Sequence, residues 1–190
     1  MEKNKVKFGL SNVHVAKITR DALGEITYGT PFAIPGAVNL TLDPEGETAD
    51  FKADNTKYFT SSSNQGYNGS LEMALITDEF RTQILGEKTD SNGAMFENVD
   101  DIISDFALGF QIDGDQSNRK FWFYNVSAKR PSTSSKTIET NKEPITDTLN
   151  ITVSPRISDG QVRTFLEETD ENTSAYNSFF ESVYEKTASV

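Results

Sequence analysis

Carboxylates are the most abundant groups in this chain that could do chemistry. The 190 residues include 29 Asp and Glu, a single histidine (His14) and no cysteine. Two carboxylates facing each other at a set separation can hydrolyse a glycoside, but an acidic chain brings carboxylates together everywhere. Histidine acid–base catalysis and a Ser-His-Asp triad would both depend on His14 alone, and thiolate chemistry is excluded because the chain has no cysteine. His14 lies within a predicted strand, where an ordinary sheet position explains it.

One segment has the spacing of a metal-binding loop at its start. Asp113-Gly114-Asp115-Gln116-Ser117-Asn118 begins like a calcium loop. Such a loop needs glycine at its sixth position and glutamate at its twelfth, where this chain has Asn118 and Tyr124. Gly, Asp, Ser and Asn are turn formers, so a hairpin turn explains the segment better. Because a Walker-type phosphate loop is also missing from the sequence, we expect no metal, no cofactor and no enzymatic activity.

The charge of the chain limits its partners. A net charge of −11 argues against a protein that binds nucleic acid tightly, because that affinity comes mostly from Lys and Arg. A surface past which DNA slides would, in contrast, be acidic. Basic residues gather in residues 1–20 and acidic ones in residues 157–190. Two solvated tails explain this pattern, and head-to-tail attraction between copies is the alternative.

The elements that would carry these residues centre on a long predicted hairpin, Asp105 to Ser127. Its first arm alternates Phe106, Leu108, Phe110 and Ile112 with small or polar residues, which predicts a strand buried on one face, with Ala107, Gly109 and Gln111 facing outward. Its second arm holds Phe121, Trp122, Phe123 and Tyr124, so both faces are aromatic. We expect one ring set to pack in the core and the other against a helix at 79–85 or a neighbouring subunit.

Short alternating segments make up most of the remaining chain. Strands are predicted at 12–19, 26–28, 38–42, 51–54, 57–62, 70–76, 94–96, 146–153 and 162–166. Asp43-Pro44-Glu45-Gly46-Glu47 is expected to end the strand before it. A change to a period of about 3.6 predicts a helix at 79–85, capped by Asp78 and stopped by Gly86, and a second helix is expected around 174–184.

Together these elements predict a mainly β protein. The expected architecture is an antiparallel β-sandwich or barrel with one short flanking helix (about residues 79–85), long loops and extended termini. We expect a single domain over 1–190, with a core at about 5–160 and an acidic C-terminal extension at 161–190. The N-terminus lacks the apolar run of a signal peptide and no window approaches a transmembrane span, which predicts a protein made in the cytosol with no membrane association.

Four groups of segments resemble a known family in their order and spacing. They are Val6-Lys7-Phe8-Gly9-Leu10-Ser11-Asn12-Val13-His14; Pro35-Gly36-Ala37-Val38 through Leu42-Asp43-Pro44-Glu45-Gly46; Asp54-Asn55 with Gly66-Tyr67-Asn68-Gly69-Ser70-Leu71-Glu72; and Ala128-Lys129-Arg130-Pro131-Ser132 with Ser154-Pro155-Arg156. Over about residues 5–160 the chain resembles the major tail protein, or tail tube subunit, of long-tailed bacteriophages of Gram-positive bacteria.

This resemblance implies a structural virion protein. It implies a β-sandwich flanked by a helix, with six copies closing into a ring and rings stacking head-to-tail into a hollow tail tube, assembled in the bacterial host cytoplasm. DNA would pass through the lumen for delivery into the host without being bound specifically. The implied partners are further copies of the chain and other tail proteins, namely the tape measure, tail terminator and distal tail proteins.

The loop 43–69 and the polar excursion 128–144 are too long for simple connectors, so we assign them to contacts between subunits. The candidate interface residues are Lys3, Lys5, Lys7, Asp43, Glu45, Glu47, Trp122, Tyr124, Arg130 and Lys136. Two alternatives stay open. A carbohydrate-binding β-sandwich module is suggested by Trp122, Phe121, Tyr124 and the many Asn side chains, and it requires exposed rings. A carboxylate-based hydrolase would require two facing acids in a cleft.

Overall fold

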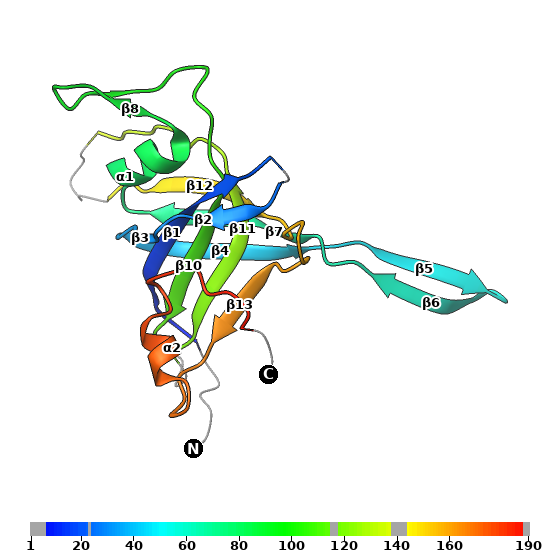
Figure 1. Ribbon diagram of the computed structural model, residues 1–190. Coiled ribbons are helices and arrows are strands. Elements are labelled where there is room, and N and C mark those ends of the chain that lie inside the picture. The colour runs from blue at the N-terminus through cyan, green and yellow to red at the C-terminus, as the bar shows by residue number, and fades with distance from the viewer. Residues whose placement is uncertain (1–6, 23, 115–117, 138–143, 188–190) are drawn as a thin grey trace.

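A computed structural model describes residues 7–22, 24–114, 118–137 and 144–187 (Figure 1). Within these residues the strands are β1 (Leu10–Arg20), β2 (Ile26–Tyr28), β3 (Phe32–Ala33), β4 (Ala37–Glu45), β5 (Thr48–Ala53), β6 (Thr56–Ser62), β7 (Gly66–Met73), β8 (Lys88–Thr89), β9 (Met95–Phe96), β10 (Phe106–Ile112), β11 (Lys120–Ala128), β12 (Asp147–Val153) and β13 (Arg163–Leu166). The helices are α1 (Asp78–Phe80), continued by a π-helical turn at Arg81–Leu85, and α2 (Thr173–Asn177).

The main sheet is antiparallel and has the strand order β2-β1-β10-β11-β12-β7-β4. β3 pairs with β1, while β13 pairs with the first half of β11 and β12 with its second half. β10 and β11 form the predicted hairpin at the centre, in a register that pairs Gly109 with Trp122. The prediction of a mainly β, antiparallel, sandwich-like fold is therefore confirmed.

The principal core lies between the two halves of this curved sheet. Its fully buried members include Val15, Leu71, Phe106, Leu108 and Ile151, which come from four different strands. Phe80 and Ile84 from the helical segment pack into the same core, and the Phe80 ring meets Phe106 edge-on at 5.6 Å between centroids. Alternation along each strand sends these side chains to one face, as the sequence pattern predicts.

The opposite face of β1, β10 and β11 is also buried, although the sequence predicted a cover on both faces only for the second arm of the hairpin. The C-terminal segment, orange to red in Figure 1, crosses this face and contributes Phe179 and Val183 to a second apolar cluster with Ala16, Ala107 and Trp122. The prediction that Ala107 and Gly109 face outward was therefore wrong. Small residues are needed there because the Trp122 ring fills the space above Gly109, where an added Cβ would lie 2.9 Å from it.

The helix at 79–85 is confirmed, with two differences in detail. Its N-cap is Thr77, whose hydroxyl accepts from the Phe80 N–H at 3.3 Å, and the predicted cap Asp78 is the first helical residue. Its last turn widens to π geometry and ends at Gly86 in the left-handed region, φ 81°. Glycine reaches that conformation at little cost, so the predicted stop is correct.

Three other boundaries differ from the prediction. β4 continues through Pro44 to Glu45, because it is the outer strand of the sheet, where a missing N–H is tolerated. β7 starts at Gly66, four residues before its predicted start at Ser70. α2 spans only Thr173–Asn177 of the helix expected around 174–184. Beyond α2, the carbonyls of Phe179 and Tyr184 accept hydrogen bonds from side chains of β11.

Candidate assembly surfaces

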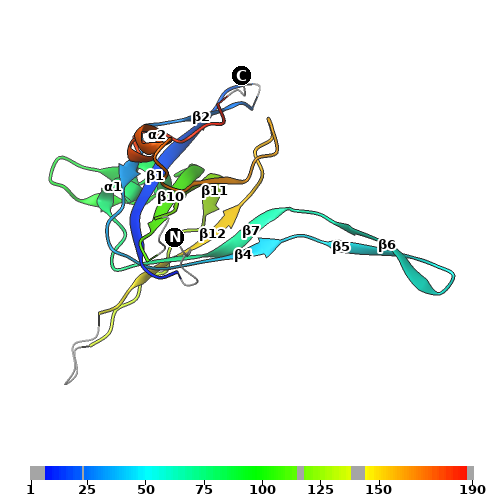
Figure 2. The same ribbon diagram turned by 90° about the horizontal axis from the view of Figure 1, so that it is seen from below.

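The most prominent surface feature is the hairpin β5–β6, which projects far from the body in both views (Figures 1 and 2). Its turn, Asp54-Asn55, has φ of 52° and 60°, the signature of a two-residue type I′ hairpin that Asp and Asn tolerate. Phe51 pairs across the strands with Phe59, and these side chains are 62% and 61% exposed. A two-stranded ribbon is at best marginally stable alone in water, so packing against a partner would stabilise this arm.

The polar excursion after β11 forms a second projection, on the other side of the body from the hairpin (Figure 2). Arg130 at its base is anchored: its guanidinium donates to the Asp101 carbonyl at 3.1 Å and lies 3.1 Å from the Glu97 carboxylate. Lys136 further along is exposed. Residues 138–143, in the last part of the predicted excursion 128–144, lie outside the described part of the chain.

The other charged candidates separate into two places. Asp43, Glu45 and Glu47 are exposed where β4 leads into the hairpin, and the Glu45 carboxylate accepts from the Asn68 amide. Lys7 is exposed near the start of β1, whereas Lys3 and Lys5 lie outside the described residues. The structure thus brings the three carboxylates together at the base of one arm.

Trp122 and Tyr124 are buried within the single chain, so their placement differs from the expectation. Trp122 is 0% exposed, and its indole N–H donates to the Phe179 carbonyl at 2.9 Å. The Tyr124 hydroxyl donates to the Tyr184 carbonyl at 2.8 Å. The ring set predicted to meet the helix at 79–85 or a neighbour instead meets the chain's own C-terminal segment. A carbohydrate platform would need these rings exposed, so the structure offers that alternative no support.

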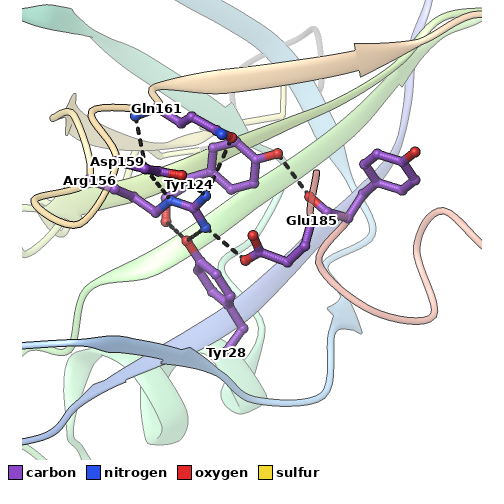
Figure 3. A network of polar contacts seen from close by, with 7 residues as sticks. Tyr28, Tyr124, Arg156, Asp159, Gln161 and Glu185 are labelled. Carbon is purple, nitrogen blue, oxygen red and sulfur yellow. Dashed lines mark hydrogen bonds and ion pairs between the residues drawn. The ribbon is translucent and has the colours of Figure 1, made fainter. Parts of the chain in front are cut away.

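A polar network centred on Arg156 fastens the C-terminal segment to the sheet (Figure 3). The buried Arg156 guanidinium lies 2.6 Å from the Asp159 carboxylate and 2.7 Å from that of Glu185, and it covers the Tyr124 ring at 4.4 Å. Burial alone would lower the pKa of Arg156, but hydrogen bonds to Asp159, Glu185 and Tyr28 raise it above its ordinary value. The hydrogen bonds from Arg156 hold the pKa of Asp159 below its usual range.

Two tyrosines beside this network should make the free energy of unfolding fall at alkaline pH. Burial raises the pKa of Tyr28 and of Tyr124 to about 12, from an ordinary value near 10. Folding therefore favours the neutral phenols, and this stabilisation is complete below pH 10 and lost as the pH rises towards 12. We expect the free energy of unfolding to fall by up to about 2 kcal/mol for each tyrosine across this window.

Urea unfolding between pH 8 and 11.5 checks this expectation. The Tyr28→Phe variant removes one of the two phenols and is the matched control, since it keeps the ring. Its stability should fall less steeply with pH than that of the unchanged chain. Equal slopes for the two proteins would contradict the role assigned to Tyr28.

The remaining candidates for chemistry do not assemble into a site. Over the described residues, no group of three or more His, Asp or Glu is placed to hold a metal ion. Asp113, from the calcium-like segment, accepts a hydrogen bond from the Ser11 hydroxyl at 2.7 Å, while residues 115–117 lie outside the described chain. His14 stacks on Phe180 with 4.6 Å between ring centroids, as a partly buried sheet residue. No helix in the described ranges has the length and apolar composition needed to cross a membrane.

Two features of the structure are not predicted by the sequence. The first is the exposed aromatic surface of the hairpin, formed by Phe51, Tyr58 and Phe59. The sequence predicts strands at these positions, and large rings in a polar segment around a two-residue turn are a signal for an exposed binding surface. The second feature is the network around Arg156, which stands out in the sequence only as part of Ser154-Pro155-Arg156. Nothing in its local sequence indicates that it meets Tyr28 and Glu185, which come from distant parts of the chain.

The chain was also compared with known protein families and with curated proteins. A family model described as phage tail tube protein matches residues 1–185, which is nearly the whole chain. None of the curated proteins compared with the chain matched it. The chain therefore belongs to the phage tail tube protein family and is a structural protein of the phage tail.

Proposed function

We propose that six copies of this chain close into a ring and that the rings stack head-to-tail into the tail tube, through which DNA is delivered into the host. The observation that carries the proposal is the β5–β6 hairpin, which exposes two paired phenylalanines on a ribbon whose described residues contact mainly each other. An exposed ribbon of this kind is a liability for a monomer and is relieved by a neighbour in a closed assembly.

The free edges of the sheet and the charge of the chain support the same proposal. β4 and β2 end the strand order of the main sheet, so each leaves one side for pairing with a neighbouring copy. A net charge of −11 on each of six copies would repel the phosphates of DNA, so DNA would slide through without being bound. Assembly would take place in the host cytoplasm, with the tape measure, tail terminator and distal tail proteins at the centre and ends of the tube.

Electron microscopy of the purified, concentrated protein tests this proposal. We expect sixfold rings and hollow tubes, together with a sedimentation coefficient that rises with concentration because assembly follows mass action. An electrophoretic mobility assay at physiological salt should show no shift of double-stranded DNA. A protein that stays monomeric at every concentration tested would overturn the proposal. Tight binding of DNA would overturn the part of it in which DNA slides through the lumen without being bound.

A further inference from the structure

An apolar groove of about 750 Å³ opens between β4 and the end of the β10–β11 hairpin. Its walls come from β1, β4, β7, β10, β11 and β13, and rings dominate them: Phe8, Tyr67, Phe110, Phe121, Phe123 and Phe165. A cavity of roughly 150 Å³ accommodates one benzene ring, so this groove has room for more than one additional aromatic side chain.

The rim of the groove is apolar and its charges are positive. Phe8, Val38 and Phe165 line the groove and are each at least half exposed to solvent. Lys7, Arg119 and Arg163 also line it, and no carboxylate is among the described lining residues. Arg119 is ion-paired with Glu167 at 2.6 Å, which leaves Lys7 and Arg163 as the cations that bear most on an incoming group.

The hairpin arm has the complementary properties. Phe51 and Phe59, which pair across its strands, present two adjacent rings, and Tyr58 falls at the register shift beside this pair. Residues 43–62 hold five carboxylates (Asp43, Glu45, Glu47, Asp50, Asp54) and two lysines (Lys52, Lys57), a net charge of −3. The tip points away from the body of its own chain (Figure 2), so a groove that receives it belongs to another copy.

We propose that the groove binds the Phe51 and Phe59 face of the β5–β6 hairpin from a second copy of this chain. The two surfaces differ and lie apart on one molecule, so their contact is head-to-tail and can propagate from copy to copy. The rings fill the groove, while carboxylates of the arm approach Lys7 and Arg163. This inference rests on the proposed function and names the surface that accepts the arm.

Disulfide trapping tests the contact, since the chain has no cysteine of its own. One protein carries Ser61→Cys, an exposed position two residues along the strand from Phe59 that leaves both rings in place. A second protein carries Val38→Cys, so a link between positions 38 and 61 must join two copies. A matched mixture replaces the second protein with Ile157→Cys, another exposed aliphatic residue on the body. After mild oxidation, linked peptides are quantified by mass spectrometry and the same samples are imaged by electron microscopy.

We expect the 38–61 link to exceed the 157–61 link by about fivefold or more, because docking raises the local concentration of one thiol pair only. Rings or tubes without an excess of the 38–61 link would overturn this inference and leave the proposed function standing. A dominant 61–61 link would overturn it too, since the hairpins would then pair with each other. If neither links nor assemblies form, both proposals fail.

Discussion

Replacing Trp122 with alanine should cost about 3–5 kcal/mol of folding free energy, the range for truncating a large buried aromatic residue. The indole is fully buried between Gly109 and the C-terminal segment, and its N–H donates to the Phe179 carbonyl at 2.9 Å. The substitution opens a cavity and leaves that carbonyl without its donor. Because domains of this size are stable by only about 5–15 kcal/mol, much of the chain should be unfolded or lack its C-terminal cover.

Urea unfolding followed by far-ultraviolet circular dichroism measures this loss without relying on the only tryptophan of the chain. Trp122→Phe is the matched control, since it keeps a ring over Gly109 but removes the N–H, and it should cost about 1–2 kcal/mol. In the unchanged protein, tryptophan emission should be blue-shifted and should move to the red on unfolding. A Trp122→Ala protein of normal stability that fails to assemble would instead place the indole at a subunit interface.

Removing the β5–β6 hairpin should abolish assembly and leave the monomer folded. Glu47 and Ser63 lie side by side at its base, where the Ser63 N–H donates to the Glu47 carbonyl at 2.9 Å. Replacing residues 48–62 with Asn-Gly joins these positions through a two-residue turn that favours type I′ geometry. The free energy of unfolding should change by no more than about 1 kcal/mol, because the described ribbon packs mainly on itself.

Analytical ultracentrifugation and electron microscopy measure assembly, and thermal unfolding measures the monomer. Tyr58→Thr is the matched control, because it keeps the hairpin and its Phe51–Phe59 pair while removing a neighbouring exposed ring. This control should assemble like the unchanged chain. Tubes formed by the shortened protein would show that the arm is dispensable for assembly.

Local sequence patterns specify the central hairpin, the helical segment and the fold class of this chain. Alternation over Phe106–Ile112 and the aromatic run at Phe121 to Tyr124 specified two paired strands, and β10 and β11 have nearly the predicted bounds. Phe80, Ile84 and Gly86 define a short amphipathic helix through their spacing and the glycine stop, although the cap is Thr77 and not the predicted Asp78. These features depend on neighbours in the chain, so periodicity and turn chemistry suffice to predict them.

In contrast, the cover of the second face of this hairpin and the direction of the arms depend on how distant segments pack together. Trp122 and Tyr124 meet Phe179 and Tyr184, more than 50 residues away, through hydrogen bonds to main-chain carbonyls. Every residue has a carbonyl, so the side-chain pattern of the C-terminal segment did not identify it as the cover. Likewise, alternation assigned Phe51 and Phe59 to strands but could not show that their ribbon leaves the body. Burial of a face depends on which distant segment reaches it, and that information exists only once the chain is folded.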